Sequence, residues 1–123
     1  MRVFVVDDRA AFRSAICTLL RAAHQLVLVG EAESGELALA AISESDPDFV
    51  LMDVRMPGMG GIDAARAIKH RRPSTVVVLI STTHPSELSP AASSCGADAV
   101  IWKPDLRSGV LEALWLQHRP AMT

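Results

Sequence analysis

The sequence contains no tyrosine and only two cysteines, and its aromatic residues make up just 4% of the chain. Cys17 and Cys95 lie far apart and lack C-x-x-C spacing, so we expect buried free thiols rather than a redox pair. No apolar run approaches the roughly 20 residues that a membrane-spanning helix needs. The first six residues run straight into two aspartates, which is not the pattern of a signal peptide. We therefore expect a cytoplasmic protein without a membrane segment.

A basic block is also absent, and the formal net charge is −2. This charge and the small number of aromatic residues do not indicate direct binding of nucleic acid. The 123 residues, of which 50% are hydrophobic, suit one domain. A chain of this length can bury its own core without disulfides or metals. We expect a single domain over residues 1–123.

Five short apolar runs alternate with five segments of helical periodicity. Apolar runs that end in turn residues indicate strands buried on both faces, and apolar residues three or four apart indicate helices. Alternation of the two predicts βαβ units with a mostly parallel sheet, which is an α/β fold. The predicted strands cover 3–6, 26–29, 49–52, 76–80 and 99–102, and the predicted helices cover 9–23, 34–45, 61–72, 86–95 and the stretch after 105.

Two local signals bear on the last two helices. Pro90 falls in the middle of the segment 86–95, where an interior proline costs about 3 kcal/mol or more. We therefore predict either a frayed helix or a short one, with Ser89 as its cap and Pro90 in its first turn. Asp105 precedes the final apolar stripe, and its side chain is of a type that caps helices.

A charged or hydroxyl side chain follows each predicted strand. Because parallel strands end at the same edge of a sheet, the fold delivers these side chains to one place. In chain order they are Asp7 and Asp8, Glu31 and Glu33, Asp53, Ser81 and Lys103.

Several carboxylates packed together repel one another, and a divalent hard cation relieves that repulsion. Mg²⁺ takes oxygen ligands and keeps several waters, so Asp7, Asp8 and Asp53 beside an open face suit it. A carboxylate nucleophile, a metal and the amine of Lys103 together suggest phosphoryl transfer, with the Ser81 hydroxyl binding a phosphoryl oxygen. Taken singly, the same residues have ordinary structural explanations: a helix cap, a turn and a solvated surface amine.

In these residues and their spacing, the sequence resembles the receiver domain of bacterial two-component response regulators over essentially its whole length. The resemblance implies a flavodoxin-like, doubly wound (βα)5 fold with a five-stranded parallel sheet in the order 2-1-3-4-5. The spacing after Ser81 is most similar to regulators of the LuxR, NarL and FixJ class. The matching motifs are the pair Asp7 and Asp8, Asp53-x-x-Met56-Pro57 running into Gly61-Ile62, Ser81, Gly96-Ala97 and Lys103-Pro104.

The resemblance also implies roles for single residues. Asp53 would accept a phosphoryl group from a phosphohistidine of a sensor histidine kinase. Asp8, Asp53 and the backbone carbonyl of Arg55 would bind Mg²⁺ directly, with Asp7 acting mainly through water. Ser81 and Lys103 would hold the phosphoryl group, and their movement would switch the surface of the fourth helix, fifth strand and fifth helix. The Lys103–Pro104 bond is typically cis in this family.

Three positions depart from the family pattern. Val100 stands where the family usually has a tyrosine or phenylalanine, so the usual aromatic readout is missing. Trp102 lies one residue before Lys103 on the opposite strand face, and we interpret it as a packing or interface residue. Gly60 replaces the usual Asp or Asn of the turn, which loosens that turn.

The leading hypothesis is a phosphorylatable signalling switch rather than an enzyme, either standing alone or forming part of a longer transcription regulator, because the tail 116–120 indicates no output domain. An alternative is a binding module that acts by protein–protein contact without phosphorylation. A nucleotide- or flavin-binding enzyme would need a phosphate-binding loop after the first strand, where two acids stand instead. An aspartyl phosphatase would need an Asp-x-Asp arrangement there. Leu111, Trp115 and Leu116 exceed a narrow apolar stripe and suggest a homodimer contact on the final helix.

Overall fold

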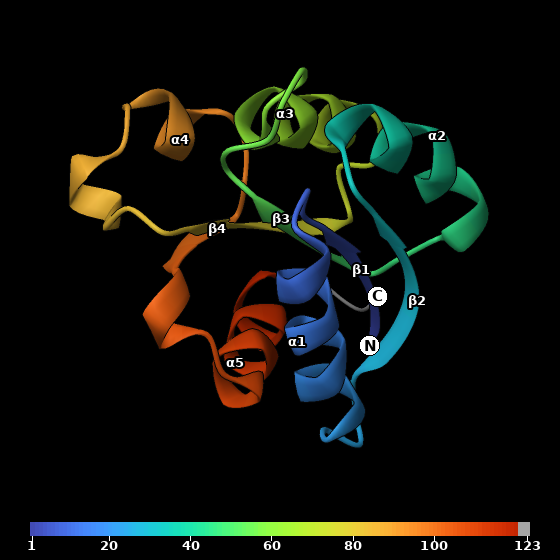
Figure 1. Ribbon diagram of the computed structural model, residues 1–123. Helices are drawn as coiled ribbons and strands as arrows, with labels where there is room; N and C mark the ends of the chain where they lie inside the picture. Colours follow the sequence, from blue (N-terminus) through green and yellow to red (C-terminus); the bar gives the residue numbers. More distant parts are fainter. Residues whose placement is uncertain (121–123) are drawn as a thin grey trace.

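The computed structural model describes residues 1–120 and confirms the predicted five-stranded parallel sheet. The strands lie in the order β2-β1-β3-β4-β5, as in flavodoxin-like folds (Figure 1). The elements are β1 Arg2–Val6, α1 Ala10–Arg21, β2 Val27–Ala32, α2 Gly35–Ser45, β3 Phe49–Asp53, α3 Gly61–Arg71, β4 Val76–Ser81, α4 Ala91–Ser94, β5 Ala99–Trp102 and α5 Ser108–His118.

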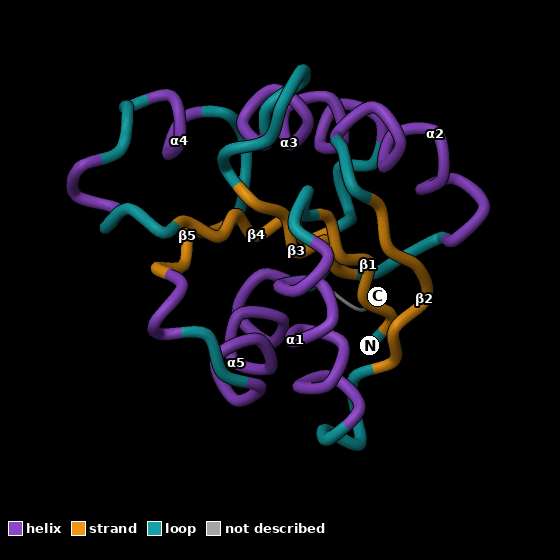
Figure 2. The backbone as a smooth tube through the Cα atoms, in the orientation of Figure 1, coloured by secondary structure: helices purple, strands orange, loops and turns teal. Residues whose placement is uncertain are grey.

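Two layers of helices cover the sheet. Helices α1 and α5 lie on one face, and α2, α3 and α4 lie on the other (Figures 1 and 2). Strands β3 and β4 are buried along their whole length, because both of their faces pack against helices. The two resulting cores are centred on Phe4, Met52 and Ile68 on one side, and on Ile16, Leu51 and Leu111 on the other. Rigid packing on both faces fixes the strand ends that carry the site.

Most predicted elements are confirmed, and the differences lie mainly in their ends. Strand β2 runs three residues further than expected, to Ala32, because it pairs with β1 as far as Val6. The hydroxyl of Ser34 accepts a hydrogen bond from the amide of Leu37 and caps α2. Cys17 and Cys95 are buried free thiols, as expected. Within residues 1–120, no helix combines the length and apolarity needed to cross a membrane.

Helix α4 is only four residues long, which confirms the effect expected of Pro90. A separate 3-10 turn covers Pro85–Glu87, so the predicted segment is broken in two. Pro90 itself occupies the cap position, one residue later than predicted. The Ser89 hydroxyl nevertheless accepts a hydrogen bond from the amide of Ala91, which is the role expected of a capping side chain.

Two expectations about the chain after β5 are wrong. Asp105 does not cap α5, because Lys103–Asp105 forms its own 3-10 turn and the helix begins only at Ser108, with Arg107 at the cap position. The Lys103–Pro104 bond is trans, as are the other peptide bonds of the described residues. The trans form is the lower-energy form of an X-Pro bond, and the turn closes with the Leu106 amide donating to the Lys103 carbonyl.

The exposed apolar surface of α5 is smaller than predicted. Leu111 is fully buried, because α5 packs against α1 and the sheet. Trp115 is partly buried against the same core. Leu116, by contrast, is 62% exposed. The apolar excess of this helix is therefore mostly core rather than surface.

An ion pair between Lys69 and Asp98 joins α3 to the segment before β5. The Lys69 ammonium donates to Asp98 at 3.0 Å and to the carbonyl oxygens of Pro73 and Thr75 at 3.0 and 2.9 Å. The same Asp98 oxygen accepts from the amide of Val77 at 2.8 Å. Both ion-paired side chains are only 19% exposed. This cluster ties the start of β4 to the start of β5.

Replacing Asp98 by alanine should lower the free energy of unfolding by about 2–3 kcal/mol. The change leaves the Lys69 ammonium without its carboxylate partner and the Val77 amide without its acceptor. Urea unfolding checks this value. The matched control is Arg66→Ala, which removes an ion pair to Asp63 whose side chains are 57% and 68% exposed. That change should cost less than about 1 kcal/mol. Equal losses for the two variants would contradict the assignment.

Candidate functional site

Three carboxylates meet at the carboxyl edge of the sheet. Asp7 and Asp8 follow β1, and Asp53 is the last residue of β3, the strand beside it. Each of the three offers an oxygen atom, and these oxygens lie within 4.8 Å of one another. Asp7 and Asp53 are buried, whereas Asp8 is exposed. The cluster thus has a closed side within the protein and an open side toward solvent.

The turn after Asp53 depends on glycine at two positions. Gly61 begins α3, and its amide donates to the Val54 carbonyl at 2.9 Å. A Cβ atom at Gly61 would lie 2.0 Å from the Asp53 carbonyl oxygen, so any larger residue would displace the backbone that carries the carboxylate. Gly58 has a φ of +74°, a conformation that L side chains rarely adopt. The chain therefore leaves β3 in one fixed direction.

Two cations face these acids. The Lys103 ammonium, which follows β5, lies 3.5 Å from an Asp7 oxygen and 3.7 Å from an Asp53 oxygen, and its side chain is only 10% exposed. The guanidinium of Arg9 lies 3.7 Å from oxygens of both Asp7 and Asp53. Because these contacts are longer than the roughly 2.7–2.9 Å that is typical of charge-assisted hydrogen bonds, they lower the repulsion among the acids without closing the cluster.

The Asp53 carboxyl has a pKa above its ordinary value. Burial, reinforced by the negative charge of Asp7, raises the pKa of Asp53 from 3.8 to about 6. A hydrogen bond from the Arg55 amide, at 3.3 Å, and the charge of Arg9 act in the opposite direction. Asp53 is therefore a carboxylate at pH 7 but a poorly solvated one, which is a condition that favours a nucleophile.

The structure brings together most of the side chains expected at this edge, but not all. Ser81 ends β4 next to β3 and is buried, yet its hydroxyl oxygen accepts from the Thr83 amide at 3.0 Å. Among residues 1–120, Ser81 has no hydrogen bond to the acids. Glu31 points elsewhere, because it pairs with Arg13 at 3.2 Å. The acid cluster with Lys103 is thus formed, and Ser81 stands beside it.

The sequence alone does not indicate a role at the site for Arg9 or Phe12. It places Arg9 at the start of the predicted helix 9–23 and Phe12 on the apolar stripe of that helix. Phe12 lies under the Lys103 ammonium, 3.6 Å from the ring centroid, and Arg9 lies 5.6 Å from the same centroid. Their places in the first turn after the acid pair could have indicated this, since that turn must adjoin the carboxyl edge.

The donor set fits Mg²⁺. All three side chains are hard oxygen donors, and the exposed side of Asp8 leaves room for the waters that Mg²⁺ retains. Neither cysteine nor histidine is part of the cluster, so the donors do not suit zinc. The cations near the cluster stand at 3.5 Å or more and do not fill it.

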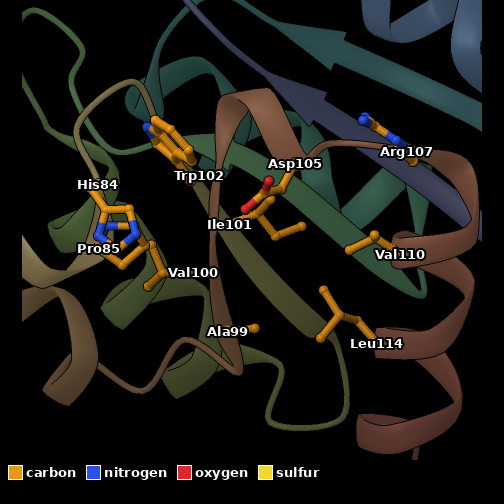
Figure 3. A pocket seen from close by; sticks show the side chains of 10 residues that line it. All are labelled: His84, Pro85, Ala99, Val100, Ile101, Trp102, Asp105, Arg107, Val110 and Leu114. Atoms are coloured by element: carbon orange, nitrogen blue, oxygen red, sulfur yellow. The ribbon is translucent and has the colours of Figure 1, made fainter.

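A groove of about 570 Å³ lies away from this edge, along the outer side of β5. Figure 3 shows Val110 and Leu114 of α5 on one side and His84 and Pro85 on the other. Val100 lines the groove on the side of His84 and Pro85, where a bulkier side chain would fill part of the space (Figure 3). The groove is therefore open beside the position at which the family pattern has an aromatic ring.

Trp102 lines the end of the same groove nearest the site. Its indole N–H donates to the carbonyl of Thr82 at 3.3 Å, and its ring meets His84 edge-on with centroids 5.3 Å apart. Trp102 is thus a packing residue, as its position on the opposite strand face indicated, and it ties β5 to the loop that follows Ser81.

Comparison with known proteins agrees with this geometry. A family model described as the response regulator receiver domain matches residues 3–114. The response regulator GacA of Pseudomonas viridiflava is 37% identical over 103 residues, covering 84% of this chain and 48% of that protein. A protein-glutamate methylesterase/protein-glutamine glutaminase of Agrobacterium fabrum is 38% identical over 104 residues, covering 84% of this chain and 30% of that protein.

Solved structures lead to the same family. The signal receiver domain of the response regulator NarL from Mycobacterium tuberculosis superposes with a TM-score of 0.82 at 34% identity, covering 92% of this chain and 94% of that one. A LuxR-family two-component response regulator from Aurantimonas gives a TM-score of 0.85 at 28% identity, covering 98% and 88%. The chain spans about half the length, or less, of the curated relatives it matches.

Replacing Asp53 by asparagine should stabilise the metal-free chain at pH 7 by about 1–3 kcal/mol, because one pKa unit corresponds to about 1.4 kcal/mol. The native carboxyl keeps its proton up to about pH 6, whereas the unfolded one loses it near 3.8. Folding is therefore favoured by protonation below this window, and that contribution is lost as the pH rises through it. The advantage of asparagine should vanish below about pH 4.

Urea unfolding in the presence of EDTA, at several pH values, measures this difference. Asp63→Asn is the matched control, since the Asp63 side chain is 68% exposed on α3 and should change stability by less than about 0.5 kcal/mol at any pH. An Asp53→Asn chain that is less stable than the native chain at pH 7 would show that the carboxylate is not under electrostatic strain.

Proposed function

The chain belongs to the response regulator receiver domain family, and we propose that residues 1–123 form a receiver that accepts a phosphoryl group on Asp53 from a phosphohistidine of a sensor histidine kinase. The observation that carries this proposal is the placement of Asp53: a buried carboxylate with a raised pKa, within 4.8 Å of two further acids and 3.7 Å from an ammonium. A merely structural aspartate would need none of these neighbours.

The transfer step makes one bond and breaks one. An Asp53 oxygen attacks the phosphorus atom, the bond between phosphorus and the histidine nitrogen breaks, and the imidazole leaves with the electron pair. The product on this chain is an acyl phosphate. Asp53 is ionised at pH 7, because its pKa of about 6 lies below that pH. Its poor solvation favours attack, since little water must be removed first.

Lys103 would bind the transferred group. Its ammonium already lies 3.7 Å from the Asp53 oxygen, so it faces the charge that arrives there. Ser81 ends the neighbouring strand, and its hydroxyl oxygen is used only as an acceptor, which leaves the O–H free to donate to a phosphoryl oxygen. Ser81 is the last residue of β4, and Lys103 directly follows β5.

Asp8, Asp53 and the backbone carbonyl of Arg55 would hold Mg²⁺ directly, with Asp7 acting mainly through water. Arg55 adjoins Asp53 in the turn and already donates its amide to that carboxylate at 3.3 Å. When bound, the ion would neutralise charge on the acids and on the phosphoryl oxygens.

Movement of Ser81 and Lys103 would bias the surface formed by α4, β5 and α5, since both residues adjoin it. We infer that this surface controls a downstream output, and regulation of transcription is the output best supported. Relatives of the NarL and LuxR type point that way, whereas the methylesterase relative shares the receiver but carries another output. We propose that this domain does not itself bind nucleic acid, since its formal net charge is −2 and its aromatic residues are few.

A second candidate is a receiver-like binding module that acts without phosphorylation. Val100 in the groove and the four-residue α4 favour it, because the surface that responds in this family is altered here. The complete set of acids with Lys103 favours the phosphorylated switch instead. The two candidates differ in whether Asp53 is modified.

Incubation with acetyl phosphate and Mg²⁺ should add one phosphoryl group to the native chain, detected by intact-protein mass spectrometry. Asp53→Ala should abolish the addition, and EDTA should reduce it strongly. Asp63→Ala, which removes an exposed acid on α3, should leave it unchanged. A native chain that stays unmodified, or an Asp53→Ala chain that is still modified, would favour the binding module.

A homodimer contact at the C-terminal end of α5 is a further part of the proposal. Leu116 is 62% exposed and adjoins a hollow of about 200 Å³ lined in part by Met1, Leu26 and Trp115. An apolar side chain beside such a hollow suits an isologous contact between two copies.

Light scattering should give the mass of a dimer for the native chain with Mg²⁺ and beryllofluoride, a phosphoryl mimic. Leu116→Glu should give a monomer under the same conditions. Leu37→Glu changes a 50%-exposed leucine on α2 and should behave like the native chain. A monomeric native chain with and without the mimic would contradict the contact.

A further inference from the structure

The ammonium of Lys103 lies over the face of an aromatic ring. Its Nζ atom is 3.6 Å from the centroid of the Phe12 ring, which is about as near as its closest carboxylate oxygen, that of Asp7 at 3.5 Å. The Lys103 side chain is 10% exposed, so the contact is largely shielded from water. A cation over a ring face is attracted by the negative charge of that face, and the attraction is strongest when water is excluded.

The contact does not follow from packing alone. Phe12 lies in the first turn of α1 and is partly buried against the core formed with Ile16 and Leu20, as any residue of that helix stripe would be. A leucine would satisfy such a position. Its ring face, however, meets a charged atom that comes from the far end of the sheet, 91 residues later in the chain.

Lys103 lacks a tight partner at the acid cluster. Its distances to the Asp7 and Asp53 oxygens, 3.5 and 3.7 Å, exceed those of charge-assisted hydrogen bonds, which are about 2.7–2.9 Å. An ammonium with a long, flexible stem would otherwise collapse onto one of these acids or turn toward water. The Phe12 ring provides a face that holds the ammonium without neutralising its charge.

We propose that Phe12 is a positioning residue: its ring holds the Lys103 ammonium beside Asp53, in long ion pairs and largely shielded from water, ready for the oxygens of an incoming phosphoryl group. This inference rests on the proposed phosphoryl transfer to Asp53 and adds a residue to it. The ring centroid lies 3.6 Å from the Lys103 ammonium and 5.6 Å from the Arg9 guanidinium, so we assign the effect of the ring to Lys103. Removal of the ring should therefore slow transfer without weakening the binding of Mg²⁺.

The contact itself can be tested without any phosphorylation. Protons above a ring face resonate upfield, so the ε-methylene protons of Lys103 should appear upfield of the other lysine, Lys69, in NMR spectra of the native chain. Phe12→Leu should remove that displacement, and Phe12→Tyr should keep it. An ordinary Lys103 resonance in the native chain would overturn the inference whatever the phosphorylation data show.

The effect on transfer is measured as the rate of acyl phosphate formation from acetyl phosphate at saturating Mg²⁺. Phe12→Leu should lower this rate about five- to tenfold, as loss of a shielded cation–π contact implies. Phe12→Tyr retains the ring face and should stay within about twofold of the native rate. Leu19→Met, on the same helix and against the same core, is the matched control and should leave the rate unchanged.

A double-mutant cycle with Lys103→Met shows whether Phe12 acts through the ammonium. In that background Phe12→Leu should change the rate by less than about twofold, because the cation is gone. The affinity for Mg²⁺, measured by calorimetry, should change less than about twofold in Phe12→Leu, since the ring does not contact the acids. If Phe12→Leu folds poorly, Phe12→Met replaces it as the variant without a ring.

The outcomes separate the two levels of the proposal. Equal slowing by Phe12→Leu with and without Lys103, failure of Phe12→Tyr to restore the rate, or a weakened Mg²⁺ site would each show that Phe12 serves the fold rather than Lys103. A native chain that takes up no phosphoryl group would reject the transfer to Asp53 itself, while the NMR comparison would still decide whether ring and ammonium are in contact.

Discussion

Repulsion among three carboxylates at one edge of a parallel sheet is the constraint on which this structure depends. Asp7 and Asp53 end adjacent strands, so the backbone hydrogen bonds of the sheet hold them close whatever their charge. Burial removes the water that would screen them, and the raised pKa of Asp53 is the direct sign of the cost. Only a well-packed core on both faces of the sheet can hold such an arrangement, and strands β3 and β4 are buried throughout.

The cations near the cluster reduce this cost without removing it. The Arg9 guanidinium and the Lys103 ammonium approach the carboxylates no closer than 3.5 Å, so the cluster remains short of positive charge. A tight ion pair would make the acids stable and inert. A loose one leaves them able to bind a metal ion and leaves Lys103 able to bind a new anion. The distances at this site therefore fit a group that must change partners.

Much of the fold could be predicted from the sequence because its signals are local. A strand buried on both faces is a continuous apolar run, and Pro90 shortens α4 through its own ring. The acid pair and Asp53 could be placed because strand ends share an edge. The errors involve contacts between distant segments: α5 begins after an unforeseen turn at Lys103–Asp105, Leu111 is buried by α1, and the Phe12 ring meets Lys103. Periodicity identifies the apolar face of a helix, but not which atom of another element lies against it.

The acid cluster and the groove lie at different places on the domain. The acid cluster occupies the carboxyl ends of β1 and β3, whereas the groove with Val100 lies on the outer side of β5. Trp102 connects the two, since its strand carries Lys103 next and its indole binds the Thr82 carbonyl beside Ser81. Thr82 directly follows Ser81, so this hydrogen bond joins β5 to the segment after β4. Among the residues that line the groove, Trp102 therefore presents the largest side chain next to that segment, whereas Val100 is too small to reach it.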